Sequence, residues 1–464
     1  MEKKPRLGSE DQSDLTTGSL PKKILLFSLP LMLSNILQVL FNMSDIAVVG
    51  QFAGKEALGA VGSTAIIVSL YTGILIGMGN GVNVIVARCI GAGHKKEISD
   101  SVHTAIIICL LSGVTVMALG MIFCRDLLEI LGTKDDLIDG AELYLRIYAC
   151  GMPAMGVYNF GNAVYSAAGN TKKPLMFLLL SGIVNVILNL FFVIVVGLDV
   201  AGVALASIIS QYLSATLVVI SLMRCKEAHR VSIKRLTIDP RFAKQIVSLG
   251  FPASLQNSIF AVANLFIQAG VNSFDSLVVE GNSAAANADA LVYDLMAAFY
   301  TACSSFMGQN LGAGKRDRVI KSYFVSLAYS FGSALVIGVC LAFFGREFLM
   351  LFTKEPEVAA EGMERLRVMA FSYCVSAFMD CTIAASRGLG KSLVPTIIVI
   401  MGSCVFRVVW VYTVFAYFHT LPSLYLLYVF SWSITAIAEI SYFAHTWKKL
   451  GRVEMTAVPE RQGL

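Results

Sequence analysis

Long apolar segments dominate the chain from about residue 24 to residue 446, and only short polar segments separate them. Each segment has at least the roughly 20 residues that an α-helix needs to cross about 30 Å of hydrocarbon. Because a backbone in lipid must satisfy its hydrogen bonds internally, such segments form helices. The sequence predicts an all-α polytopic membrane protein, embedded in the lipid bilayer, with twelve transmembrane helices at approximately residues 24–50, 58–87, 101–124, 143–168, 174–197, 201–223, 244–272, 283–307, 320–345, 364–386, 393–418 and 422–446.

The composition excludes several other classes of protein. Apolar residues make up 56% of the chain and charged residues 14%, with a mean hydropathy of +0.72. The net charge of +5 does not indicate a nucleic-acid partner, because the basic residues lie between apolar segments instead of on one face. The segment ASRGLGKS at residues 385–392 follows an apolar helix, not a strand, and so does not indicate a phosphate loop. Neither HExxH nor GxSxG is present, so we expect neither an enzyme nor a cofactor.

Basic residues fall mainly on one side of the expected helices. If the N-terminus lies inside, 27 of the 36 Lys and Arg residues lie on the inner side, in keeping with the positive-inside rule. Of the others, Arg407 lies within a helix, and the rest, Arg365 among them, lie outside or at outer helix ends. The first apolar segment is too long for a removable signal peptide. We expect polar tails at residues 1–23 and 447–464, both in the cytoplasm.

The chain repeats itself after about 221 residues. CIGAG at residues 89–93 matches NLGAG at 310–314, and Pro30 matches Pro252. Since six helices separate the copies, both have the same orientation, and parallel repeats of this kind commonly enclose a transport pathway. The repeat predicts a six-helix bundle at residues 24–223, a cytoplasmic linker at 224–243 and a second six-helix bundle at 244–446.

These motifs together resemble those of one transporter family. Pro30 is followed fifteen residues later by Asp45 in NMSDIAVVG, the glycine motif recurs in both halves, and the turns GNTKKP and GLGKSLVP follow. In this order the motifs resemble the multidrug and toxic compound extrusion (MATE) family over residues 20–446. The resemblance implies two bundles in a V shape around a central cavity. It also implies a multi-pass protein of the bacterial cytoplasmic membrane, expected to act as a monomer, that exports drug-like organic molecules in exchange for H+ or Na+.

Asp45 interrupts an apolar segment, and an unpaired carboxylate in hydrocarbon costs at least about 2.5–3.5 kcal/mol. It must therefore be protonated, bound to a cation or hydrogen-bonded within the bundle. Asn185 and Asn189 are four residues apart, on one face of the fifth expected helix, and Ser207 offers a hydroxyl on the sixth. Alternatively, Asp45 caps a loop at the outer end of the first helix, and the asparagines only join helices.

The resemblance implies a role for these four residues. In the DinF-like branch of the family, matching groups form a cation-coupling site, and the chain is closer to this branch than to the typical NorM arrangement, whose acids correspond here to Phe260 and Ser376. Asn189 departs from the branch, which often has Asp there. Fewer charged ligands weaken the case for Na+. The sequence still predicts a candidate Na+ site at Asp45, Asn185 and Asn189, and proton coupling stays open.

Pro30 predicts a place where the first helix bends, because proline removes one backbone hydrogen bond from a helix. We expect Asp45 to alternate between a charged and a neutralised state and the helix to bend at Pro30 in response. Ion entry would in this way be coupled to drug release. A static kink is the structural alternative.

The second half carries different charges. It has no acid at the position equivalent to Asp45, but acids lie deep in its expected helices at Asp289, Asp294 and Asp380. Arg407 is their natural counter-ion: its depth favours Asp294, whereas the family resemblance favours Asp289. This set predicts either a site for a cationic drug or a second proton, or a structural ion-pair network.

A lipid-linked oligosaccharide flippase of the same superfamily is the closest competing function, because it shares the parallel six-plus-six plan. Flippases of that kind usually carry cationic residues in the cavity to bind phosphate. Here Arg407 is the only basic residue expected deep within a helix. The sequence therefore favours an antiporter.

Overall fold

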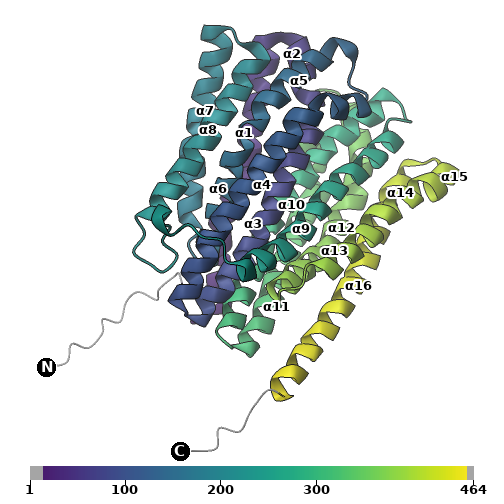
Figure 1. Ribbon diagram of the computed structural model, residues 1–464. Helices are drawn as coiled ribbons and strands as arrows, with labels where there is room; N and C mark the ends of the chain where they lie inside the picture. Colours follow the sequence, from purple (N-terminus) through teal and green to yellow (C-terminus); the bar gives the residue numbers. More distant parts are fainter. Residues whose placement is uncertain (1–13, 457–464) are drawn as a thin grey trace, which may run out of the picture. The chain divides into compact units, whose positions relative to one another are not determined.

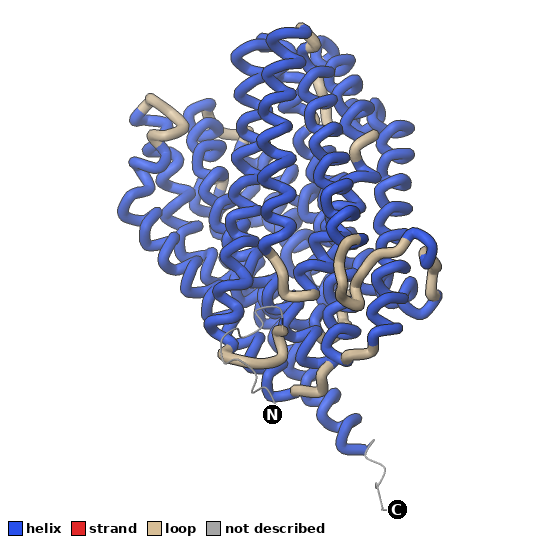
Figure 2. Tube along the Cα trace, turned by 90° about the vertical axis from the view of Figure 1, so that its left-hand side faces the viewer, coloured by secondary structure: helices blue, strands red, loops and turns tan. Residues whose placement is uncertain are grey.

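The described part of the chain is helical. The computed structural model describes residues 14–456, and these residues contain no strand (Figure 2). The prediction of an all-α polytopic fold is confirmed. The outer parts of the two expected tails, residues 1–13 and 457–464, lie outside the described residues.

The first half of the chain can be followed from purple to teal in Figure 1. Its α-helices are α1 (Leu20–Val48), α2 (Gly54–Ser63), α3 (Ala65–Ala92), α4 (Lys95–Ile130), α5 (Asp135–Ala149), α6 (Met152–Ala167), α7 (Lys172–Leu190) and α8 (Asp199–Met223). Two π-helical segments, η1 (Val49–Ala53) and η2 (Phe191–Val196), continue α1 and α7. A short 3₁₀ segment, η3 (Ile233–Arg235), lies in the linker.

The second half begins with three long helices and a fourth that ends at the GLGKS turn. Its α-helices are α9 (Pro240–Val271), α10 (Ser276–Gly312), α11 (Arg316–Leu349), α12 (Pro356–Gly388), α13 (Leu393–Val399), α14 (Phe406–Trp410), α15 (Ala416–Phe418) and α16 (Leu421–Thr456). Two further π-helical segments, η4 (Ile400–Val405) and η5 (Val411–Phe415), connect α13, α14 and α15 into one apolar span.

Eleven helical segments of the described residues are long and apolar enough to cross a membrane. The single helix expected over residues 143–168 is instead divided between α5 and α6, with the break at Cys150 and Gly151. Pro153 lies in the first turn of α6, where its missing N–H has no intrahelical partner to lose. With 16 residues, α6 is shorter than the roughly 20 residues that a membrane-spanning helix needs, so it is not among the eleven. Apolar composition identifies the segment but not the break within it.

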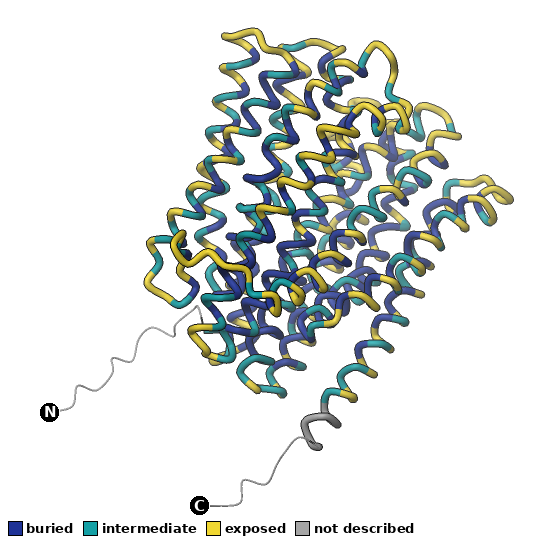
Figure 3. Tube along the Cα trace, viewed as in Figure 1, coloured by how far each residue is buried: buried dark blue, intermediate teal, exposed yellow. Residues whose placement is uncertain are grey.

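Large apolar side chains are exposed along the outer faces of many helices. Leu111 and Ile122 on α4, for example, are 53% and 66% exposed, and Figure 3 shows exposed positions recurring along the helices between buried ones. Apolar surface of this extent is rare on proteins that face water. In a bilayer the same surface contacts acyl chains, as the predicted transmembrane fold requires.

By their internal contacts, the described residues form two compact units. The first contains the chain up to Val262 together with Tyr293–Ser326 and Arg387–Leu393, and the second contains Ala263–Val292, Leu327–Ser386 and the chain from Val394 onward. The two six-helix bundles inferred from the repeat, and the V shape implied by the family, stay predictions.

The repeated glycine motif joins two helices within the first unit. Gly93 ends α3 and Gly314 follows α10, both with positive φ (76° and 68°), a conformation that favours glycine. The glycines two residues earlier face a backbone: a Cβ on Gly91 would lie 1.9 Å from a carbonyl oxygen of α10, and one on Gly312 2.0 Å from a carbonyl oxygen of α3. Each copy therefore ends its helix and lets the two helices approach closely.

A short segment before α1 is bound to α10 and α11 in the same unit. Leu15 is 1% exposed, and its backbone N–H donates to Oε1 of Gln309 at 3.2 Å. Arg318 donates to backbone oxygens of the segment, including that of Gly18 at 2.9 Å. The inner part of the expected N-terminal tail thus packs against the helices.

Candidate functional site

Asp45 lies near the end of α1 and takes its contacts from α7 and α8, all within the first unit. Nδ2 of Asn189 donates to Oδ1 of Asp45, and Oγ of Ser207 donates to Oδ2 at 3.4 Å. Asp45 is half-buried, whereas Asn189 and Ser207 are buried. Among the described residues, no Lys or Arg forms an ion pair with Asp45. The carboxylate is therefore held by neutral donors from two other helices.

The two asparagines of α7 form a polar row with Asp45. Nδ2 of Asn189 lies 3.3 Å from Oδ1 of Asn185, as their four-residue spacing predicts. Oδ1 of Asn189 is buried without a hydrogen-bond partner in the described part of the chain, although buried polar atoms normally have one. A half-turn of the amide exchanges its N–H and its oxygen, so Asn189 can offer Asp45 either a donor or an acceptor.

Two of the three helices that meet at Asp45, α1 and α7, change to π-helix directly after the site. η1 begins four residues after Asp45, η2 begins two residues after Asn189, and the two segments contact each other. π-helical segments are rare and occur frequently at functional sites. Sequence reasoning missed this feature, because no residue type in VGQFA or FFVIVV requires it.

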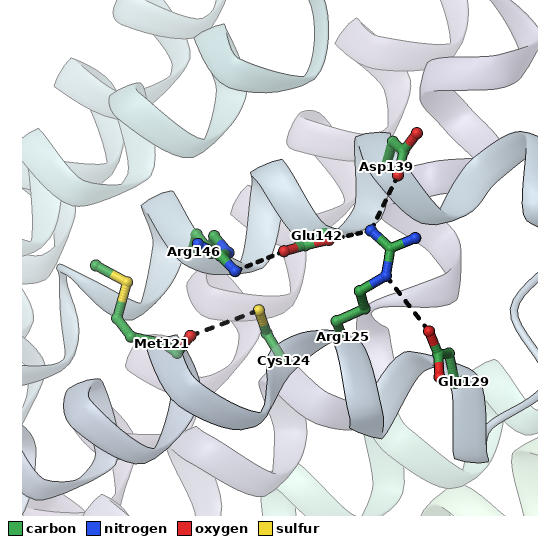
Figure 4. Close-up of polar contacts among 7 residues, drawn as sticks. All are labelled: Met121, Cys124, Arg125, Glu129, Asp139, Glu142 and Arg146. Atoms are coloured by element: carbon green, nitrogen blue, oxygen red, sulfur yellow. Dashed lines mark hydrogen bonds and ion pairs between the residues drawn. The ribbon is translucent and has the colours of Figure 1, made fainter.

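Two tyrosines of α5 lie within electrostatic range of the Asp45 carboxylate. Tyr144 and Tyr148 stack with ring centroids 5.7 Å apart, and the Asp45 charge acts on both hydroxyls. α5 is held to α4 by Arg125, which lies 2.8 Å from a carboxylate oxygen of Glu142 and also contacts two further acids (Figure 4). These ion pairs connect α4 to α5, the helix that carries the two tyrosines.

Pro30 lies within α1, which continues through it without interruption. It is buried, and its carbonyl oxygen accepts a hydrogen bond from Oγ of Ser34 at 2.9 Å. A proline at this position leaves the helix one backbone hydrogen bond short. The role of Pro30 as a hinge stays a prediction.

The second unit contains an acid in a different environment. Asp289, on α10, accepts hydrogen bonds from Arg365 and Tyr373, both on α12. Arg365 also donates to Oδ1 of Asn282, and its guanidinium lies 5.5 Å from the ring centroid of Tyr425. This carboxylate therefore has a full countercharge.

Arg365, which the sequence places outside or at an outer helix end, is only 5% exposed. Of the two acids left open as partners of Arg407, Asp289 is thus paired with Arg365 instead. The sequence carries no signal for this pairing, because it depends on how α10 packs against α12.

Arg407 lies in α14, between η4 and η5, and is buried. Its guanidinium lies 4.6 Å from the ring centroid of Tyr428 and 5.6 Å from that of Trp432. Its Nε donates to Oγ of Ser431 at 3.2 Å, and Asp380 is among the groups whose charge acts on it. Aromatic faces attract a guanidinium in this geometry.

Asp294 belongs to the first unit, and its backbone oxygen accepts a hydrogen bond from Nδ2 of Asn35 at 2.7 Å. Its pairing with Arg407, which belongs to the second unit, stays a prediction. A role of the second-half acids in binding a drug or a proton likewise stays a prediction.

Comparison with known proteins decides the family. A model of the MatE family matches residues 30–191 and, a second time, residues 252–413. This chain belongs to the MatE family. The first match includes Asp45 and both asparagines of α7, and the second begins at Pro252, in agreement with the internal repeat.

Individual MatE relatives and structures agree with this assignment. The chain is 31% identical to "Probable multidrug resistance protein YpnP" of Bacillus subtilis, over 78% of this chain and 80% of that protein. It is 26% identical to "FAD transporter" of Shewanella oneidensis, over 75% and 78%. The crystal structure "MATE in the bent conformation" has the same fold, with a TM-score of 0.88, 22% identity and coverage of 96% and 99%.

MatE family members are membrane transporters and not enzymes, and this chain is one of them. Its multidrug-resistance relatives support efflux as the direction of transport. The predicted closeness to the DinF-like branch stays a prediction.

Proposed function

We propose that the protein is a secondary antiporter that exports cationic or amphipathic organic molecules and is driven by ions that enter at Asp45. It acts as a monomer in the bacterial cytoplasmic membrane, with both termini in the cytoplasm. No cofactor takes part. The relatives named as multidrug resistance proteins support the transport direction and the broad substrate class.

One observation carries the proposal: Asp45 meets α7 and α8 through neutral hydrogen-bond donors and has no basic partner among the described residues. A carboxylate away from bulk water without a countercharge is stabilised when it takes up a positive charge. Its partners lie on two other helices, so a change of charge alters the contacts among three helices at once. That change links ion binding to helix position.

The ligand set favours H+ over Na+ as the coupling ion. Hard cations of this kind prefer several oxygen ligands and gain affinity from additional ligand charge, whereas this pocket contains a single carboxylate. Asn189 directs an N–H at Asp45, which suits an ionised carboxylate. Once Asp45 is protonated, its O–H can donate to the unpaired Oδ1 of Asn189 after the amide turns. Asn189 can therefore hydrogen-bond Asp45 in both protonation states, as a donor to the carboxylate and as an acceptor from the carboxylic acid.

A flippase of lipid-linked oligosaccharides, or a carrier of anionic molecules like the FAD transporter of Shewanella oneidensis, would need cationic side chains to bind phosphate. In the second unit, Arg365 is paired with Asp289, and Arg407 packs on two aromatic rings. Both arginines are thus engaged by protein groups. This supports organic cations over phosphate-bearing lipids as substrates.

Efflux in proteoliposomes tests the proposal. Purified protein is reconstituted, ethidium and norfloxacin are supplied as probes, and a pH gradient or a Na+ gradient is imposed separately. We expect transport under the pH gradient, loss of transport in Asp45→Asn, and wild-type rates in the control Asp136→Asn, which alters an exposed acid of α5 outside the Arg125 cluster. Transport under the Na+ gradient alone would overturn proton coupling. Absence of transport under either gradient, with scrambling of a lipid-linked oligosaccharide, would favour the flippase.

A further inference from the structure

The linker between α8 and α9 contains a cluster of three possible metal ligands, within the first unit and away from Asp45 in the sequence. Ligand atoms of Cys225, Glu227 and His229 all lie within 4.8 Å of one another. Sγ of Cys225 lies 3.4 Å from Nε2 of His229. Two ligands of a tetrahedral zinc ion, bound at about 2.0–2.3 Å, lie roughly 3.5 Å apart. The spacing of the thiol and the imidazole therefore already suits a shared ion.

The surroundings hold these groups in place. His229 is 5% exposed, and the edge of its ring meets the ring of Tyr165 on α6, with centroids 6.2 Å apart. Oε2 of Glu227 lies 3.3 Å from Nδ1 of His229, and the backbone N–H of Glu227 donates to Sγ of Cys225 at 3.5 Å. Carboxylates beside a ligating histidine and N–H donors to a ligating sulfur are typical supports of metal sites.

We propose that Cys225, Glu227 and His229 form a binding site for a transition-metal ion of the Zn2+ class. The sulfur and nitrogen donors exclude Mg2+ and Ca2+, which take oxygen ligands, and select borderline or soft cations. A thiolate and a carboxylate neutralise the two charges of the ion. Sγ of Cys225 and Nε2 of His229 supply the two protein ligands, Glu227 orients the imidazole through Nδ1 and adds its negative charge, and water completes the coordination.

Binding would tie the linker more firmly to the ends of α6 and α8. His229 packs against Tyr165, whose hydroxyl in turn contacts Oγ of Ser221 on α8 at 2.5 Å. The linker joins the two repeats of the chain, so an ion held here restrains the connection between them. All ten cysteines are free, so the Cys225 thiol is available for ligation.

Cobalt titration of the purified full-length protein, stripped with chelator and kept reduced, tests the site. Thiolate ligation of Co2+ gives a near-ultraviolet charge-transfer band. We expect this band to saturate at about one equivalent and to disappear when Zn2+ competes, but to persist in excess Mg2+ or Ca2+. Cys225→Ser, which changes one atom, should abolish the band. His229→Gln should weaken Co2+ affinity by at least about 100-fold, since even second-shell changes cost about 10–100-fold.

Two control variants keep the result specific. Cys340→Ser alters an exposed cysteine of α11, and His94→Gln removes an exposed His–Glu pair; both should leave the band and the affinity unchanged. A wild-type protein without a charge-transfer band would overturn the proposal and reduce the cluster to a Cys–His hydrogen bond. So would a band that survives in Cys225→Ser, because the thiolate would then come from another cysteine.

Discussion

Two half-buried acids of this chain lie in opposite electrostatic settings. Asp45, in the first repeat, accepts hydrogen bonds from an amide and a hydroxyl and has no basic partner among the described residues. Asp289, in the second repeat, is bonded to the guanidinium of Arg365 and to the hydroxyl of Tyr373. The chain repeats its helices and its glycine turns but not its charges.

This difference indicates which of the two acids can bind an ion and which one stabilises the structure. A carboxylate that already has a countercharge gains little from a proton or a metal ion, whereas one held by neutral donors gains a full charge interaction. We therefore propose that the Asp45 pocket exchanges ions and that the Asp289 cluster stabilises the structure. The predictions below test this division.

Removing the countercharge in the second repeat should have the largest effect on stability. Arg365→Gln leaves Asp289 largely buried without its ion partner, and breaking such a pair costs about 3–5 kcal/mol. We expect a large fall in the thermal midpoint of the purified protein, measured by fluorescence-detected unfolding. The double variant Asp289→Asn with Arg365→Gln should recover much of the loss. An unchanged midpoint in Arg365→Gln would show that the pair does not stabilise the unit.

Adding a charge to the first repeat should change ion selectivity. Asn189→Asp places a second carboxylate against Asp45, and extra ligand charge strengthens binding of hard cations. We expect Na+ to drive ethidium transport in this variant at concentrations that leave the wild type inactive. Asn189→Ala, which removes the amide without adding charge, is the matched control and should show no such Na+ dependence. Equal Na+ responses in both variants would contradict the assignment of ion exchange to this pocket.

Removing one hydroxyl that donates to each acid should give the smallest effects on stability. Tyr373→Phe takes a donor from Asp289 and should lower stability by about 1–2 kcal/mol, as for a hydrogen bond to a charged group. Ser207→Ala removes a longer hydrogen bond to Asp45, of 3.4 Å, and should lower stability by less than about 1 kcal/mol. It should also shift the pH midpoint of transport upward, because the ionised carboxylate loses a donor. A larger loss of stability in Ser207→Ala than in Tyr373→Phe would contradict the distinction between the two acids.

The first of these sites could be predicted from sequence because its signals are local. The four-residue spacing of Asn185 and Asn189 fixes their common face, and a carboxylate in an apolar segment needs polar neighbours. The family resemblance supplied the remaining step, since neither feature says which helices pack against α1. The contacts of Asp45 with Asn189 and Ser207 agree with that expectation.

The second site could not be derived in the same way. The choice between Arg365 and Arg407 as partner of Asp289 depends on how α10 and α12 pack, and positive charge near a helix end normally indicates a surface position. The breaks at Cys150 and Gly151 and the four π-helical segments were missed for a similar reason. Apolar composition encodes neither feature of the described residues.

Proton release on substrate binding tests the central claim most directly. Ethidium is added to the detergent-solubilised protein in weakly buffered solution, and the pH change is recorded with a soluble indicator. An exchanger that uses Asp45 should release up to about one proton per ethidium bound, because binding of one cation lowers the affinity for the other. Asp45→Asn should bind ethidium without releasing protons, whereas Asp136→Asn should behave as the wild type. Equal proton release from Asp45→Asn and the wild type would contradict the account.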